Sequence, residues 1–157
     1  MDLLIKNALI ITVNPKNEVL EDSNIVVTDG IIKSIGRIPD NFIPEKIIDA
    51  TDQIVLPCLV NTHTHIPMTL FRNYADDLPF WTWLMEKIKP AEDQLSAEHV
   101  YWGAKLGVLE LIRSGVTCFS DMYFFMEEVA KVSDESGIRA CISGILLDGK
   151  NFGSNYM

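Results

Sequence analysis

The chain has 157 residues, the size of one ordinary domain, with 48% hydrophobic and 22% charged residues, a balance typical of folded rather than disordered proteins. Its net charge of −9 and the lack of a Lys/Arg cluster argue against nucleic acid and anionic membrane surfaces as partners. The apolar runs are only a few residues long, which excludes a transmembrane helix within this sequence.

The first fifty-odd residues predict β-structure. Residues 3–13 place apolar side chains at every second position, interrupted at Asn7, as a half-buried strand requires. Asp29-Gly30 separates two β-branched segments and predicts a two-residue type I′ hairpin, and residues 46–49 return as a short strand. Such a segment has too small a core to be stable alone, so we expect it to pack on another part of the protein.

After Pro57 the pattern changes to alternating strands and helices. We expect a strand at 59–64, a helix at 80–89 closed by Pro90, and a longer helix that begins at Ser96 and ends before Gly115. Strand 116–120, helix 126–137 and strand 138–143 follow, and this alternation predicts a parallel α/β sheet. We therefore divide the chain into residues 1–57 and 58–157. The second part holds about three βα units, whereas a complete (β/α)₈ barrel takes about 250 residues.

The three cysteines lie in apolar runs and form an odd number. Cys58, Cys118 and Cys141 are therefore expected to be reduced, buried thiols. Together with the lack of a recognisable secretory signal at the N-terminus, they predict a cytoplasmic protein.

Two of the three histidines, His63 and His65, lie two positions apart at the end of the predicted strand 59–64. Alternate side chains of a strand share a face, so both imidazoles can point at one metal ion. Two ligands are fewer than the three or four of a zinc site. The alternative interpretation is a pair of hydrogen-bonded polar residues without a ligand.

The sequence around this pair resembles the signature of the amidohydrolase superfamily. Residues 54–65, IVLPCLVNTHTH, follow its pattern of an apolar strand, Pro-Gly, an apolar pair and Asn/Asp-x-His-x-His. Segments 66–72, 77–84, 90–93 and 120–124 are similar to the 5′-methylthioadenosine/S-adenosylhomocysteine deaminase branch. The resemblance implies an α/β fold: N-terminal strands of a small β-sandwich, then the first three or so βα units of a metal-dependent-hydrolase (β/α)₈ (TIM) barrel.

The same resemblance implies a hydrolytic deaminase of an adenine-type nucleoside, which uses one divalent metal ion, usually Zn²⁺. The metal lowers the pKa of a bound water and supplies the hydroxide that attacks the amine-bearing ring carbon. By position, His63 and His65 match the first two metal ligands. The remaining ligands and the proton-transfer residues are expected beyond Met157, so no catalytic residue lies within the chain and the 157 residues alone are expected to be inactive.

Two further residues are assigned to substrate by the resemblance. Glu92 matches a glutamate that binds ribose hydroxyls; the alternative is a solvated charge beside Asp93. Trp83 is assigned to the purine pocket, although Trp81 and Trp83 lie at helical spacing and we expect one of them to be core. His99 and Asp121 are expected to be structural.

Three positions depart from the family pattern. Cys58 and Asp52 replace glycines, and aspartate tolerates the left-handed backbone better than most residues. Gly144 stands where an arginine often contacts the 5′ tail of the substrate in the family. This glycine argues against recognition of a carboxylate-bearing tail such as that of S-adenosylhomocysteine.

Other functions therefore stay open. Enzymatic alternatives are guanine, cytosine or triazine ring aminohydrolases, and the non-enzymatic alternative is an incomplete fragment that folds or binds metal weakly. The expected partner is a small purine-nucleoside-like molecule, with self-association of an incomplete barrel or a homo-oligomer as a further possibility.

Overall fold

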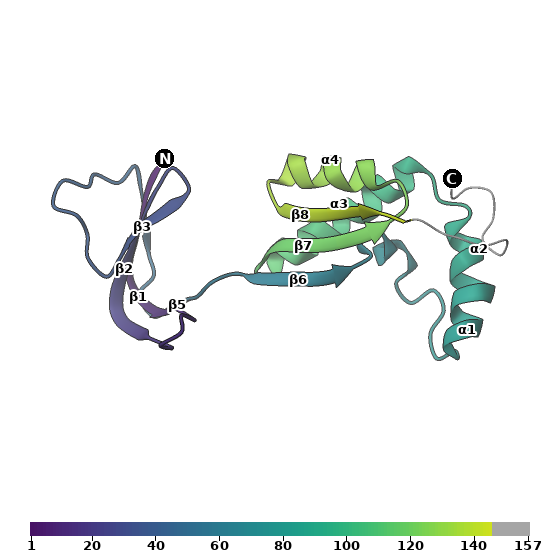
Figure 1. Cartoon of the computed structure of the whole chain (residues 1–157), viewed down its shortest axis with the longest axis horizontal. Coiled ribbons are helices and arrows are strands. Elements are labelled where there is room, and N and C mark those ends of the chain that lie inside the picture. Colours follow the sequence, from purple (N-terminus) through teal and green to yellow (C-terminus); the bar gives the residue numbers. More distant parts are fainter. Residues whose placement is uncertain (146–157) are drawn as a thin grey trace. The chain divides into compact units, whose positions relative to one another are not determined.

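The computed structural model describes residues 1–145, which fall into two compact units. The first unit is Met1–Pro57 and the second begins at Cys58 (Figure 1). The first unit contains a mixed sheet and the second a parallel sheet. Among the described residues, only the second unit contains helices. Within residues 1–145, no helix is both long and apolar enough to cross a bilayer.

The first unit is one five-stranded sheet in the order β3-β2-β1-β4, with β5 also paired to β1. Strands β2 and β3 are antiparallel to their neighbours, whereas β4 and β5 run parallel to β1. Residues 1–57 thus form a single mixed sheet. The strands are β1 Asp2–Ile11, β2 Val19–Thr28, β3 Ile31–Ile35, β4 Lys46–Asp49 and β5 Ile54–Val55.

The hairpin of this unit follows the sequence prediction, whereas the buried face of β1 does not. Asp29 and Gly30 have φ angles of 51° and 74°, as a type I′ turn requires. In β1 the buried side chains are Leu4, Ala8 and Ile10, not the predicted odd-numbered set. Both faces of this strand carry apolar residues, so a period of two cannot choose between them. Asn7, at φ 61°, lies where the pairing of β1 with β2 shifts register, as at a β-bulge.

The second unit is built on a three-stranded parallel sheet, as the sequence predicts. Strands β6 (Leu59–Thr64), β7 (Val116–Tyr123) and β8 (Arg139–Gly144) are neighbours in sequence order. This is the repeated strand–helix arrangement from which (β/α)₈ barrels are built. Helices α3 and α4 lie beside each other against the sheet. The helical segments are η1 Ile66–Phe71, α1 Phe80–Thr82, η2 Trp83–Ile88, α2 Lys89–Glu92, α3 Ala97–Arg113 and α4 Met126–Ser136.

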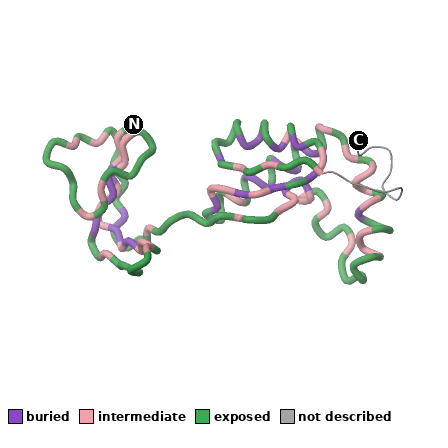
Figure 2. Tube along the Cα trace, in the orientation of Figure 1, coloured by how far each residue is buried: buried purple, intermediate pink, exposed green. Residues whose placement is uncertain are grey.

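The core of the second unit lies between the sheet and these two helices (Figure 2). Val100, Ala104 and Val108 of α3 are at most 2% exposed and belong to one cluster with Phe119 of β7. The cap of α3 fixes its start: Ser96 Oγ accepts from the His99 main-chain N–H at 3.3 Å, and His99 Nδ1 accepts from the Ser96 N–H at 3.2 Å.

Two expectations for this unit are wrong. The first helix does not end at Pro90 but continues to Glu92, because a π-helical turn, η2, precedes the proline and places it at the start of α2. There its missing N–H breaks no helical hydrogen bond. The cysteines are free but not buried: Cys58 and Cys141 are exposed and Cys118 is half-buried.

Candidate active site

The His63 and His65 side chains lie together at the carboxyl end of β6. Their ring centroids are 5.0 Å apart and their planes are inclined by 76°. His63 is the fifth residue of the strand, and His65 follows its last residue and caps η1. The backbone therefore brings both imidazoles to the end of the parallel sheet at which the sites of barrel enzymes form.

A hydrogen bond to the neighbouring strand fixes the orientation and the tautomer of His65. Its Nδ1 lies 2.6 Å from the main-chain oxygen of Met122. A carbonyl oxygen only accepts, so Nδ1 carries the proton, and in the neutral imidazole Nε2 keeps a free lone pair. Metal-binding histidines are commonly held in this way, by donating the other ring N–H to a carbonyl or a carboxylate.

Asp121 holds the main chain directly after His65. Its carboxylate is 2% exposed and accepts from the main-chain N–H of Ile66 at 3.2 Å. Burial raises the pKa of this carboxyl, and the Ile66 hydrogen bond and the charges of His65 and His63 oppose that shift. Asp121 therefore satisfies an N–H at the start of η1, the structural role that the sequence predicts.

Glu92, the last residue of α2, reaches the end of β7. The Tyr123 hydroxyl donates to Glu92 Oε1 at 2.6 Å. Burial raises the pKa of the Glu92 carboxyl, opposed mainly by this hydrogen bond and then by the charges of His65 and Lys89. A solvated charge in an acidic turn would not be half-buried and paired with a core tyrosine, so this arrangement disagrees with that alternative.

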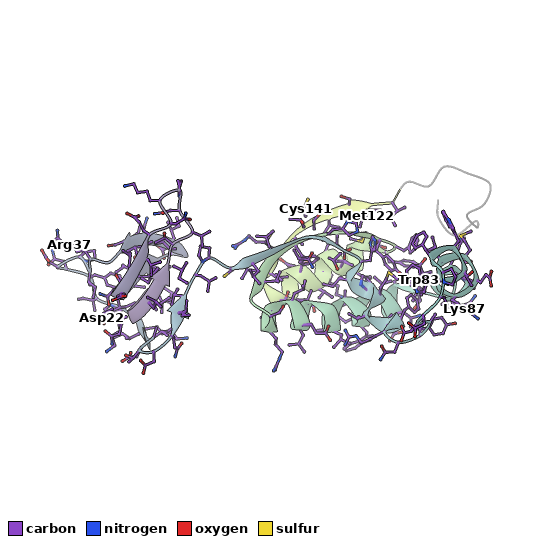
Figure 3. The ribbon with its side chains drawn as sticks, turned by 90° about the horizontal axis from the view of Figure 1, so that it is seen from below. Asp22, Arg37, Trp83, Lys87, Met122 and Cys141 are labelled. Atoms are coloured by element: carbon purple, nitrogen blue, oxygen red, sulfur yellow. The ribbon has the colours of Figure 1, made fainter. Side chains whose placement is uncertain are left out.

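A cavity of about 360 Å³ brings together three of the four residues assigned from the sequence, His65, Trp83 and Glu92. Trp83 comes from the η2 helix and Met122 from the sheet, and both are labelled in Figure 3. His63 does not line this cavity. The other residues that line the cavity are mostly apolar: Met68, Phe80, Leu84, Met85, Ile88, Lys89, Met122, Tyr123, Phe124 and Ile145.

The two tryptophans are not alike, and neither is core. Trp81 is 70% exposed, and Trp83 is half-buried in the cavity wall with its ring 5.9 Å from that of Phe80. The expectation that one of them belongs to the core is therefore wrong. Trp81 belongs to α1, and Trp83 is the first residue of η2.

Gly144 ends β8 and lines a second cavity of about 380 Å³, which Glu92 and Tyr123 also line. A Cβ built at Gly144 meets no atom within 4 Å. The position expected to face the 5′ tail of a substrate is therefore open. Asp52, one of the two residues that replace a family glycine, has φ 61° and keeps the left-handed conformation.

Among residues 1–145, no group of three or more His, Cys, Asp and Glu side chains converges on a point that could hold a metal ion. The structure thus brings two candidate ligands together and adds no third from this part of the chain. Sequence reasoning missed two supporting groups, the Met122 oxygen and the Tyr123 hydroxyl. The oxygen is a backbone atom without a sequence signal, and Tyr123 was included only in the family-like segment 120–124, with no role assigned to it.

Comparison with known proteins gives a consistent result. The profile of the amidohydrolase family matches residues 54–154. The chain is 46% identical over 143 residues to a 5-methylthioadenosine/S-adenosylhomocysteine deaminase of Thermoanaerobacter pseudethanolicus, covering 91% of this chain and 33% of that protein. It is 49% identical over 147 residues to a 5′-deoxyadenosine deaminase of Methanosarcina mazei, covering 94% and 34%.

A solved structure agrees with these relatives. An adenosine deaminase from Xanthomonas campestris, solved with bound zinc, matches with a TM-score of 0.83 and 38% identity, over 88% of this chain and 33% of that one. The chain thus spans about a third of the length of the curated relatives it matches.

Proposed function

Because the chain belongs to the amidohydrolase family, we propose that it forms the part of a metal-dependent hydrolytic deaminase that supplies two metal ligands and contacts an adenine-type nucleoside. The observation that carries this proposal is the shared cavity of His65, Trp83 and Glu92. We further propose that β6, β7 and β8 begin a (β/α)₈ barrel, and that the five-stranded sheet is one layer of a composite β-sandwich.

His63 and His65 would hold one divalent ion, with Zn²⁺ as the candidate because neutral imidazole suits zinc and the zinc-bound adenosine deaminase is a relative in structure. The fit is supported by His65, whose Nδ1–H is donated to Met122 and whose Nε2 is free to ligate. When bound, the ion supplies water of lowered pKa, the nucleophile that a hydrolytic deamination needs. This chain's own task is to fix both rings at the end of β6.

Glu92 and Trp83 would orient the nucleoside in the cavity. A carboxylate accepts hydrogen bonds from both hydroxyls of a ribose, and hydrogen bonds to an ionised acceptor are the strong ones. Trp83, next to Phe80, offers an aromatic face for stacking the purine. The mostly apolar walls would favour burial of the purine ring.

The remaining ligands and the groups that move protons would come from further chain, so residues 1–157 by themselves would be inactive. The site as described accounts for binding and orientation, not for the proton transfers. We propose a cytoplasmic protein, in keeping with the free thiols at Cys58, Cys118 and Cys141.

The experiment is ammonia release by the full-length protein that contains these residues. We expect turnover of 5′-deoxyadenosine, 5′-methylthioadenosine and adenosine, and weaker turnover of S-adenosylhomocysteine, because Gly144 offers no charge to its carboxylate. Preferred turnover of guanine, cytosine or an aminotriazine would replace the proposed substrate class. No ammonia from any of them, with the metal bound, would favour the non-enzymatic alternative.

A further inference from the structure

We propose that Tyr123 is a positioning residue, which holds the Glu92 carboxylate in the orientation that accepts the two hydroxyls of a ribose. The inference rests on the proposed function of this cavity. It assigns the specificity for a vicinal diol to a pair of residues, of which only Glu92 is suggested by the sequence.

The Glu92 side chain needs an external support because of where it is attached. It ends α2, a helix of four residues that follows a π-helical turn and contains Pro90. The cap geometry of such a short segment does not fix the torsions of a long side chain. The hydrogen bond from the Tyr123 hydroxyl to Oε1, 2.6 Å long, restrains the carboxylate instead. Two carboxylate oxygens offer about four acceptor sites, so this bond leaves room for two hydroxyl donors.

Tyr123 is rigid enough to act as that support. It is the last residue of β7, is paired with Gly144 of β8, and its side chain is only 4% exposed. Its ring belongs to the core cluster of the second unit and lies 4.9 Å from the ring of Phe124. The hydroxyl therefore has a fixed position relative to the sheet.

The same strand end also positions the metal side of the cavity. Met122, the preceding residue, accepts the hydrogen bond from His65, and the Tyr123 ring lies 6.0 Å from the His65 ring. Consecutive residues of β7 thus hold the imidazole and the carboxylate. A nucleoside whose ribose is bound by Glu92 would then have its purine ring at a fixed distance from His65.

The test is Tyr123→Phe in the full-length protein, because phenylalanine fills the same core space and lacks only the hydroxyl. Adenosine and 2′,3′-dideoxyadenosine are the two substrates, since they differ only in the diol. We expect kcat/KM for adenosine to fall roughly tenfold or more, the loss typical of a hydrogen bond to a charged group, and kcat/KM for the dideoxy compound to stay within about twofold. Glu92→Gln should produce the same selective loss.

The matched control is Tyr101→Phe, which removes another tyrosine hydroxyl that donates to a glutamate, Glu135, at 2.9 Å, outside the cavity. This variant should leave kcat/KM for both substrates unchanged. Equal losses for both substrates in Tyr123→Phe, or a selective loss in Glu92→Gln alone, would overturn the positioning role while leaving the deaminase proposal intact. Wild-type protein that releases no ammonia from adenosine, 5′-deoxyadenosine or 5′-methylthioadenosine would overturn the proposed function itself, and the inference with it.

Discussion

Gly107 of α3 lies directly against Ile66, the residue that follows His65, and no side chain fits between them. A Cβ built at Gly107 would collide with Ile66 Cγ1 and would approach the Ile66 main-chain oxygen to 3.0 Å. One turn earlier, a Cβ at Gly103 would lie 2.6 Å from the oxygen of Pro67. These two glycines let η1 dock on α3, and the docked η1 determines where the chain leaves His65.

Gly107→Ala should displace η1 and with it the candidate metal ligand His65. Overpacking of this kind costs about 1–3 kcal/mol of unfolding free energy, and we expect a lower zinc affinity in the full-length protein as well. Chemical denaturation and zinc titration measure the two effects. Gly144→Ala is the stability control, because its Cβ would meet nothing within 4 Å. Equal stability of Gly107→Ala and the wild type would contradict the close contact.

Arg72 and Glu110 fasten the other end of η1 to α3. The guanidinium makes two hydrogen bonds to the carboxylate, at 2.9 and 2.7 Å, and these hold the pKa of Glu110 below its ordinary value. A lowered folded-state pKa contributes stability that is present above the unfolded pKa and is lost as the pH falls through the folded one.

Glu110→Gln should therefore destabilise the full-length protein at pH 7, and the difference from the wild type should shrink below about pH 4.5. Thermal unfolding across that pH range, at low and high salt, provides the measurement. Both partners are about half exposed, so we expect salt to weaken the effect. A difference that is independent of pH would mean that the glutamine acts through something other than the lost charge.

Residues 1–157 expressed alone should self-associate. The strands β6 and β8 are each paired on one side only within the described sheet, and Leu59 and Val60 are 56% and 60% exposed. Unpaired strand edges and exposed apolar side chains favour association between chains. Size-exclusion chromatography with light scattering should detect oligomers. A monomer that melts in one sharp transition would contradict this expectation.

The sequence predicted those elements that a few neighbouring residues determine. The Asp29-Gly30 turn requires two positive φ angles, and Ser96 carries a capping side chain, so a few residues decide each structure. The parallel order of β6, β7 and β8 follows from strand–helix alternation. For the site, the spacing of His63 and His65 predicted neighbouring imidazoles, because that geometry is local to one strand.

Features without a distinct local sequence pattern were not predicted. The continuation of the helix through Pro90 depends on a π-helical turn, which leaves no distinct sequence pattern. Cys58 and Cys141 lie in apolar runs yet are exposed, so the hydrophobicity of their neighbours in sequence did not decide their burial. The link from Tyr123 to Glu92 joins residues 31 positions apart, and no periodicity of the sequence reports such a pair.

The most direct test of the account is the metal content of the purified full-length protein and its His63→Ala, His65→Ala and His99→Ala variants, measured together with ammonia release from 5′-deoxyadenosine. His99 is the matched control, because it is an exposed histidine in the α3 capping box. We expect about one zinc per wild-type chain, retained in His99→Ala and lost together with activity in both other variants. Wild-type metal content in either His63→Ala or His65→Ala would contradict the assignment of these two histidines as metal ligands.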